Sequence, residues 1–269
     1  MRLSWLGVYA LAYLMFLYAP IVLLPLFAFN DATIIAFPLS GFTTHWFAEL
    51  WTNKALHSAV LNSLEIAVSA AIVATVLGMC AARAGAQHNF PGKSAIIGFI
   101  MLPLVLPEII IAVSLLVILV QIMGLQLSNW TVIAAHVLIC TPFSIAILNG
   151  AFQNLDPSLE EAGLDLGETR WSAFRLITLP LVMPGIISSL LISFTISLDE
   201  FIIAFFLTGS NPTMPVYIWS LNKDFDALPV VMALGTILVA LSIALLTIAE
   251  YFRRRGIARA GLKDTGGFL

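Results

Sequence analysis

The chain has 269 residues, of which 60% are hydrophobic and 10% are charged, and its mean hydropathy is +1.01. Soluble domains contain about 45–50% apolar and about 25% charged residues, so this composition excludes a water-soluble enzyme and also a disordered chain. The formal net charge of −3 argues against a nucleic-acid partner.

Six apolar runs are long enough to cross the hydrocarbon core of a bilayer, which takes about 20 helical residues. They cover residues 6–29, 59–82, 95–121, 130–152, 181–207 and 228–251. The first run is too long for the apolar part of a secretory signal, and no small-residue cleavage site follows it. The sequence therefore predicts one all-α integral membrane domain over residues 1–269, with six spans.

The charges of the connecting segments predict the orientation. With the N-terminus inside, ten of the twelve Lys and Arg lie on inner segments, and only Lys54 and Lys223 lie outside. This asymmetry follows the positive-inside rule, so we expect a multi-pass protein of the bacterial inner membrane with both termini in the cytoplasm. The outer loop 30–58 carries Trp46, Phe47 and Trp51, which suit the membrane interface.

The third run contains a helix-breaking signal beside an acid. Pro107 has no amide to donate to the carbonyl of Pro103, and that open carbonyl lies one turn before Glu108. Broken helices with open carbonyls near mid-membrane are a recurring way to build a cation site.

The inner loop 153–178 is too long for a connection without structure of its own. Asp156 and Pro157 are typical of a helix start, and Gly167 is typical of a left-handed helix end. The residues between them form an apolar stripe with helical spacing, namely Leu159, Ala162, Gly163 and Leu166.

A second short helix is expected from Thr169 onward. The first helix is amphipathic and too short to span a membrane. From the residues alone, it either lies against lipid or docks into a partner.

Four carboxylates fall within the predicted spans, at Glu65, Glu108, Asp199 and Glu200. An acid at such a depth costs about 2.5–3.5 kcal/mol on insertion scales and is a functional candidate by default. No Lys or Arg lies at the same depth, so a cationic substrate is expected. The alternative is that the acids are protonated or hydrogen-bond to neighbouring helices.

The fifth run has polar residues on one side. One helical face carries Ser189, Ser193, Ser197 and Glu200, and the adjacent strip carries Thr195 and Asp199. Such a pattern favours a helix that lines a water-filled path. Neighbouring residues point about 100° apart on a helix, so the two acids cannot both face that path squarely.

No catalytic motif is found. The nearest approach to a phosphate-binding loop, at Gly92-Lys93-Ser94, has Gln87 where the first glycine should be. The four histidines are scattered and predict no metal site. His136 is better interpreted as a hydrogen-bonding residue between packed helices. The chain is therefore not expected to be an enzyme or to bind a cofactor.

Part of the inner loop resembles the EAA signature of ABC-importer permeases. The matching residues are Glu161-Ala162-Gly163, then Gly167, then Ile177-x-Leu179-Pro180, with Gly163 replacing the second alanine. The resemblance implies the type I importer permease fold and a coupling helix that docks on a separate cytoplasmic ATPase, which holds the ATP and Mg. The coupling residues so implied are Glu161, Ala162, Gly163, Leu166, Gly167 and Pro180.

Two further stretches resemble permeases that import spermidine and putrescine. They are residues 106–116, LPEIIIAVSLL, and 197–209, which begins SLDEF and ends FLTG. The resemblance implies a second homologous permease subunit, an ATPase dimer and an extracytoplasmic binding protein that delivers the polyamine. The implied substrate path includes Asp199, Glu200, Glu108, Glu65, Ser197 and Ser193.

Two alternatives remain open. Glu108 and Glu200 stand where aspartate is commoner, which allows another cationic or zwitterionic amino compound as substrate. A passive channel or proton-coupled secondary transporter would also explain the acids, but it gives no reason for the structured inner loop.

Overall fold

The structure, a computed structural model, describes residues 5–87, 89, 91–223 and 225–259, and these form helices joined by loops. The chain divides into two compact units, Ala55–Tyr217 and the pair of segments Met1–Lys54 and Ile218–Leu269. The single domain over residues 1–269 stays a prediction. The longer helices are α1 (Trp5–Ala28), α3 (Lys54–Gln87), α6 (Asn129–Gln153), α9 (Leu179–Asp199) and α12 (Leu228–Arg259).

In the unit formed by the two ends of the chain, α12 packs against α1 and against the short helix α2 (His45–Thr52). The loop 30–58 is tied to itself by Trp46, which is buried and donates its indole N–H to the carbonyl of Asn30 at 2.8 Å. Trp51 remains 76% exposed. Of the loop aromatics expected at the interface, Trp46 is therefore used for packing, whereas Trp51 stays largely exposed.

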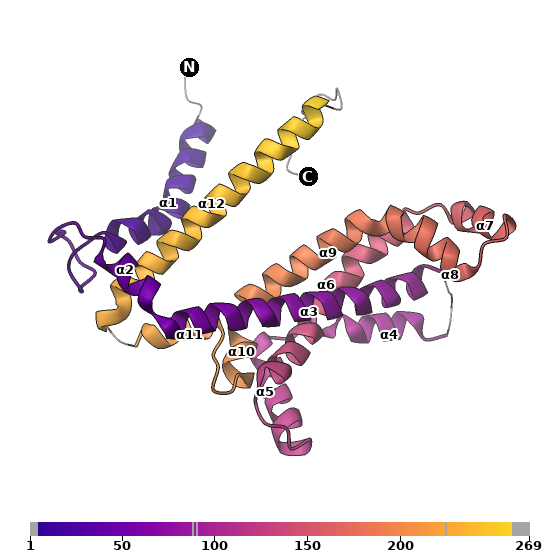
Figure 1. The fold of residues 1–269 in the computed structure, drawn as a ribbon, viewed down its shortest axis with the longest axis horizontal. Helices are drawn as coiled ribbons and strands as arrows, with labels where there is room; N and C mark the ends of the chain where they lie inside the picture. Colours follow the sequence, from indigo (N-terminus) through magenta and orange to yellow (C-terminus); the bar gives the residue numbers. More distant parts are fainter. Residues whose placement is uncertain (1–4, 88, 90, 224, 260–269) are drawn as a thin grey trace. The chain divides into compact units, whose positions relative to one another are not determined.

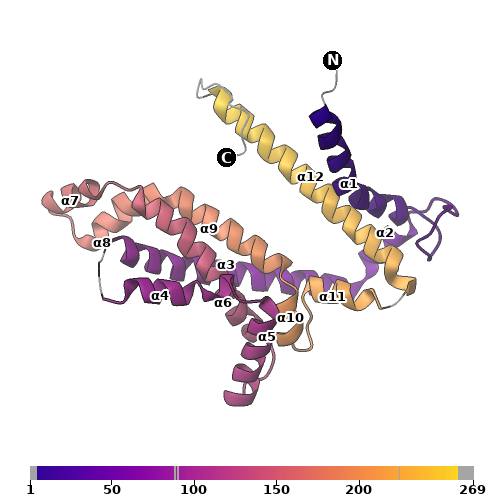
Figure 2. The same cartoon turned by 180° about the vertical axis from the view of Figure 1, so that it is seen from behind.

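In the central unit, α3, α6 and α9 lie side by side, and the short helix α4 (Lys93–Ile100) runs beside α3 (Figures 1 and 2). The core at one end of this bundle is formed by Ala82, Leu148, Phe152 and Val182. At the other end, α6 packs with two short helices, α5 (Glu108–Leu116) and α10 (Ile202–Leu207). The core there includes Ile66, Ala112, Ile139, Ile203 and Leu207.

Glycines set the closest helix contacts of the bundle. A Cβ atom at Gly78 of α3 would lie 2.5 Å from the Cβ of Ser144 on α6. A Cβ atom at Gly185 of α9 would lie 2.7 Å from the Cβ of Ala151, also on α6. Small residues are common where membrane helices meet, because they let two backbones approach closely.

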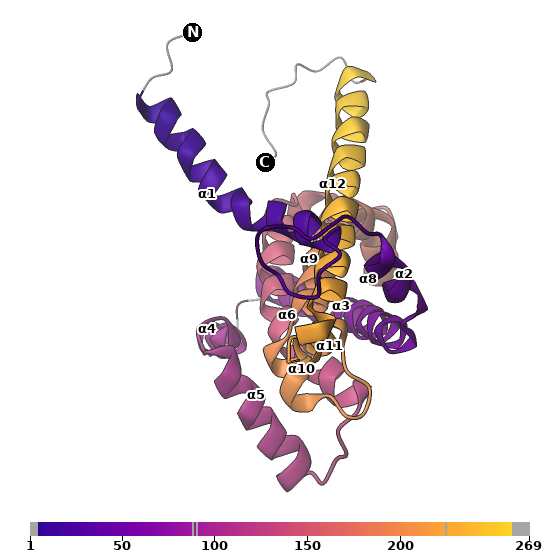
Figure 3. The same ribbon diagram turned by 90° about the vertical axis from the view of Figure 1, so that its left-hand side faces the viewer.

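Two of the predicted spans are not continuous helices. The run 95–121 is divided by a 3₁₀ turn, Leu102–Leu104, so that α5 leaves in a different direction from α4 (Figure 3). The run 181–207 is divided between α9 and α10. The first break follows from the missing amide of Pro107, whereas the cause of the second lies in a side chain described below.

Within the part of the chain that the structure describes, four helical stretches are long and apolar enough to cross a membrane, namely Trp5–Ala28, Lys54–Ala86, Asn129–Gln153 and Arg170–Asp199. The apolar stretches Glu108–Ile122 and Leu228–Ala244 are shorter. The all-helical membrane fold is thus confirmed, and the count of six spans stays a prediction.

We predict that Gly78→Ala lowers the thermal unfolding midpoint of the detergent-solubilised protein. The added methyl group would overlap backbone and side-chain atoms of α6, and such overpacking costs about 1–3 kcal/mol. The matched control is Gly150→Ala on α6, where a Cβ atom meets nothing within 4 Å. An equal midpoint for the two variants would contradict the close contact between α3 and α6.

Candidate functional site

The break between α9 and α10 is held by one carboxylate. Glu200 follows α9 in an extended conformation (φ −70°, ψ 121°). Its Oε1 accepts the backbone N–H of Ile203, and its Oε2 accepts that of Ala204, both at 3.0 Å. These amides belong to the first turn of α10, where no helical carbonyl is available to them. Glu200 therefore acts as the cap of α10, and its negative charge lies at the positive end of that helix.

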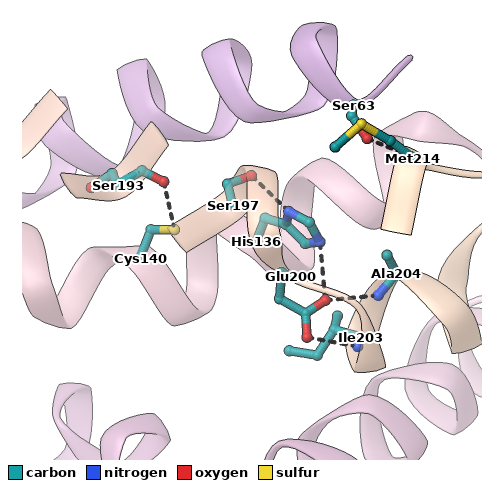
Figure 4. Close-up of polar contacts among 9 residues, drawn as sticks. All are labelled: Ser63, His136, Cys140, Ser193, Ser197, Glu200, Ile203, Ala204 and Met214. Atoms are coloured by element: carbon teal, nitrogen blue, oxygen red, sulfur yellow. Dashed lines mark hydrogen bonds and ion pairs between the residues drawn. The ribbon is translucent and has the colours of Figure 1, made fainter. Parts of the chain in front are cut away.

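A histidine from α6 completes this arrangement (Figure 4). The Nδ1 atom of His136 lies 2.7 Å from the hydroxyl of Ser197, and its Nε2 atom lies 3.5 Å from Oε2 of Glu200. The side chains of His136 and Glu200 are 0% and 4% exposed. The interpretation of His136 as a hydrogen-bonding residue between helices agrees with this geometry, but its link to Glu200 has no signal in the sequence.

The serine face of α9 packs against other helices. Ser189 lies 3.1 Å from the hydroxyl of Thr75 on α3, and Ser193 lies 2.9 Å from that of Ser144 on α6. All three serines of this face are buried. Ser193 and Ser197, two residues expected on the substrate path, both contact α6, Ser193 through the hydroxyl of Ser144 and Ser197 through the ring of His136.

The adjacent strip of α9 borders a cavity of about 650 Å³. Thr195 and Asp199 line it from α9, Glu108 lines it from the start of α5, and Glu200 lies at its edge in the break. The remaining lining is apolar and comprises Pro103, Leu104, Leu106, Ile139, Phe143, Ile196, Phe201 and Ile202. Among its described lining residues, the cavity thus has three carboxylates and no basic side chain, which suits an organic cation with an aliphatic body.

The fourth acid lies elsewhere. Glu65 of α3 borders a separate cavity of about 310 Å³, together with Ser128, Asn129, Ser210 and Asn211 among its polar neighbours. The four acids expected on the path are therefore divided into a group of three and a single residue.

The inner loop folds as two short helices. In α7 (Pro157–Asp165), the carboxylate of Asp156 accepts the N–H of Ser158 at 3.0 Å. Hydrogen bonding by Ser158, through its side chain and then its backbone, lowers the pKa of Asp156. Gly167 has φ +91° and ends the helix in the left-handed conformation. The second helix, α8 (Arg170–Ala173), begins after Thr169 and continues through a π-helical turn, Phe174–Thr178, into α9. These helix limits agree with those expected.

An ion pair that the sequence does not signal fixes α7 to the bundle. Arg83 near the end of α3 donates to Oε1 of Glu160 at 2.8 Å, and Oε2 of Glu160 accepts the hydroxyl of Thr178 at 3.0 Å. The guanidinium group of Arg83 also lies over the ring of Phe174, 4.1 Å from its centre. Glu160 and Arg83 are 77 residues apart in the chain, so no local pattern links them.

The apolar stripe of α7 is only partly used within this chain. Gly163 is buried, and a Cβ atom there would lie 2.6 Å from Cδ1 of Ile177. In contrast, Leu159 is 44% exposed and Leu166 is 87% exposed, and Trp171 of α8 is 70% exposed. Glu161, Ala162 and Gly167 are exposed as well. These helices therefore present a mostly uncovered surface, which we call the α7–α8 surface.

The fold is that of an ABC importer permease. One similar solved structure is a bacterial ABC transporter involved in the import of the acidic polysaccharide alginate, with a TM-score of 0.72, 20% identity, and 93% of each chain covered. A second similar structure is a bacterial alginate ABC transporter in complex with an alginate pentasaccharide-bound periplasmic protein. Its TM-score is 0.72 at 21% identity, and the comparison covers 93% of this chain and 92% of that chain.

The chain belongs to the family described as binding-protein-dependent transport system inner membrane component, which its residues 74–257 match. It is 35% identical over 241 residues to the spermidine/putrescine transport system permease protein PotC of Haemophilus influenzae, covering 89% of this chain and 93% of that protein. It is 36% identical over 275 residues to the putrescine transport system permease protein PotI of Escherichia coli K12, covering 96% of both. It is therefore a multi-pass permease subunit of the inner membrane.

We predict that Glu160→Gln loosens α7 in the isolated permease. The variant loses the charge that pairs with Arg83, and a hydrogen bond to a charged group contributes about 1.5–3 kcal/mol, less where solvent reaches it. Amide hydrogen exchange in residues 157–166 should become severalfold faster.

The matched control is Glu161→Gln, which removes the neighbouring carboxylate of the same helix. Glu161 is exposed and has no hydrogen-bond or ion-pair partner among the residues that the structure describes. Equal exchange rates in the two variants would show that the ion pair does not hold α7.

Proposed function

We propose that this permease moves the polyamines putrescine and spermidine from an extracytoplasmic binding protein into the cytoplasm, driven by ATP that a separate subunit hydrolyses. The single observation that carries the substrate class is the cavity with three carboxylates and no basic lining residue. A polyamine supplies ammonium groups for the acids and methylene groups for the apolar walls. The names of the relatives, PotC and PotI, support the same substrate class.

The two exposed acids are the groups proposed to bind the substrate. Among the residues that the structure describes, Glu108 and Asp199 have no hydrogen-bond or ion-pair partner, and both are exposed to the cavity. Glu200, by contrast, is occupied as a cap and supports the site by holding the break beside Asp199. Glu65 is proposed to serve a separate part of the path.

The α7–α8 surface is proposed to dock on the ATPase. A helix of nine residues with exposed apolar side chains cannot span a bilayer. Its position in the EAA-like segment supports a contact made by Glu161, Ala162, Leu166 and Gly167, with Pro180 beginning α9 behind them. Gly163 is assigned a different task within this surface, which is to hold α7 against Ile177.

The assembly is proposed to contain a second homologous permease chain, two ATPase subunits and the binding protein. The complex of a structurally similar transporter with its periplasmic protein supports the last of these. The positive-inside asymmetry of Lys and Arg supports an orientation with both termini, and the α7–α8 surface, in the cytoplasm.

We predict that Asp199→Asn lowers the energy-dependent uptake of labelled putrescine by about tenfold or more, which corresponds to the loss of about 1.4 kcal/mol of interaction with the cation. Uptake is measured in cells that lack their own polyamine import and that express this chain with its neighbouring subunits. Assembly, measured by co-purification, should be unchanged.

The control is Glu49→Gln, which removes an exposed carboxylate of α2 that lies 3.7 Å from His45 and lines no part of the cavity. It should leave uptake unchanged. Wild-type uptake in Asp199→Asn would exclude Asp199 from the site. If the assembled complex hydrolyses ATP but takes up neither amine, polyamines are excluded as its substrate, and the proposal that the protein is part of an ATP-driven importer still stands.

We predict that Gly167→Asp reduces the amount of ATPase that co-purifies with the permease and lowers transport in proportion. The substitution places a negative charge on the α7–α8 surface at a position with φ +91°. Gly167→Asn is the matched control, since it has the same shape without the charge and tolerates this backbone conformation. A normal ratio of ATPase to permease in Gly167→Asp would contradict docking at this surface.

A further inference from the structure

The three carboxylates of the cavity are not equivalent. Glu108 and Asp199 have no polar partner among the residues that the structure describes. Glu200 contacts two backbone amides of α10 and the ring of His136. The cavity therefore offers a substrate two available charges, although three acids border it.

Both ring nitrogens of His136 lie near a polar group. The ring is fully buried, and Ser197 holds Nδ1 at 2.7 Å. The atom Nε2 has no partner with good hydrogen-bond geometry, and Glu200 is the acceptor that it approaches, at 3.5 Å. An ionised carboxylate only accepts hydrogen bonds, so an ionised Glu200 favours the tautomer of His136 that carries its proton on Nε2. A buried donor without this acceptor would lose its hydrogen bond to water and gain nothing in return.

We propose that His136 is a positioning residue that determines which polyamine is preferred, by keeping Glu200 on the first turn of α10 and away from the substrate. This inference rests on the proposed polyamine function. It assigns the choice between diamine and triamine to a side chain that does not line the cavity.

The physical reason is the number of charges left for the substrate. With Glu200 held by His136 and α10, two carboxylates face a cation, which matches the two ammonium groups of putrescine. Without His136, the Glu200 carboxylate loses its side-chain partner at the edge of the cavity, where an ammonium group can replace it. Spermidine, with a third charge, gains from this additional carboxylate, and putrescine gains little.

The test compares initial rates of spermidine and putrescine uptake by the complete complex in proteoliposomes, with saturating binding protein and ATP. We expect His136→Leu to raise the ratio of spermidine to putrescine uptake by about tenfold, which corresponds to about 1.4 kcal/mol. His136→Gln is the conservative variant, because its amide nitrogen can donate to Glu200, and its ratio should stay close to that of the wild type. The double variant His136→Leu/Glu200→Gln should also return to the wild-type ratio.

If His136→Leu lowers spermidine and putrescine uptake equally and leaves their ratio unchanged, the proposal is overturned, because His136 then contributes only to helix packing. A raised ratio that persists in the double variant would also overturn it, since His136 would not act through Glu200.

A further measurement does not depend on the folding of His136→Leu. Glu200→Gln alone should keep the wild-type ratio even where total uptake falls, whereas Asp199→Asn should lower the uptake of both amines. A ratio in Glu200→Gln that differs from the wild-type ratio would show that Glu200 already serves the substrate, and it would overturn the proposal. If the wild-type complex hydrolyses ATP but imports neither amine, the proposed polyamine function itself fails. An unchanged ratio in a complex that does import both amines overturns only the role proposed for His136.

Discussion

Backbone hydrogen bonding in a membrane is the constraint on which the central unit depends. No water is available in the hydrocarbon region to satisfy the first amides of a helix, so a break there requires internal acceptors. Glu200 supplies two of them to α10, and its carboxylate lies at the amino end of that helix beside His136. The break can therefore exist beside the cavity, and Asp199 is left as the last residue of α9 with its carboxylate exposed.

The sequence predicts features that are local. The long apolar runs locate the main helices, and the missing amide of Pro107 locates the first break. The caps at Asp156 and Gly167 were predictable because each depends on residues within a few positions. The second break was not, because the apolar run continues through residues 201–207 and hydropathy does not register where a helix ends inside it.

Features that depend on distant contacts could not be predicted. Helical periodicity correctly groups Ser189, Ser193 and Ser197 with Glu200, and places Thr195 with Asp199. It does not say what each face contacts, and for the serine face the contacts are α3 and α6. The pairing of Arg83 with Glu160 is likewise a product of the folded bundle. The sequence supplies the candidate acids, and the fold decides which of them remain available.

The continuity between α8 and α9 has a mechanical consequence. The chain passes from Arg170 through the π-helical turn to Asp199 without an interruption of the helix. Helix α9 alone has 21 residues and is about 30 Å long. The ion pair of Glu160 and the contact of Gly163 with Ile177 lie toward one end of this helical stretch, and the acidic cavity lies at the other. A tilt imposed at α7 would reach Asp199 along this stretch, with the π-helical turn and Pro184 as the places where the helix bends most readily.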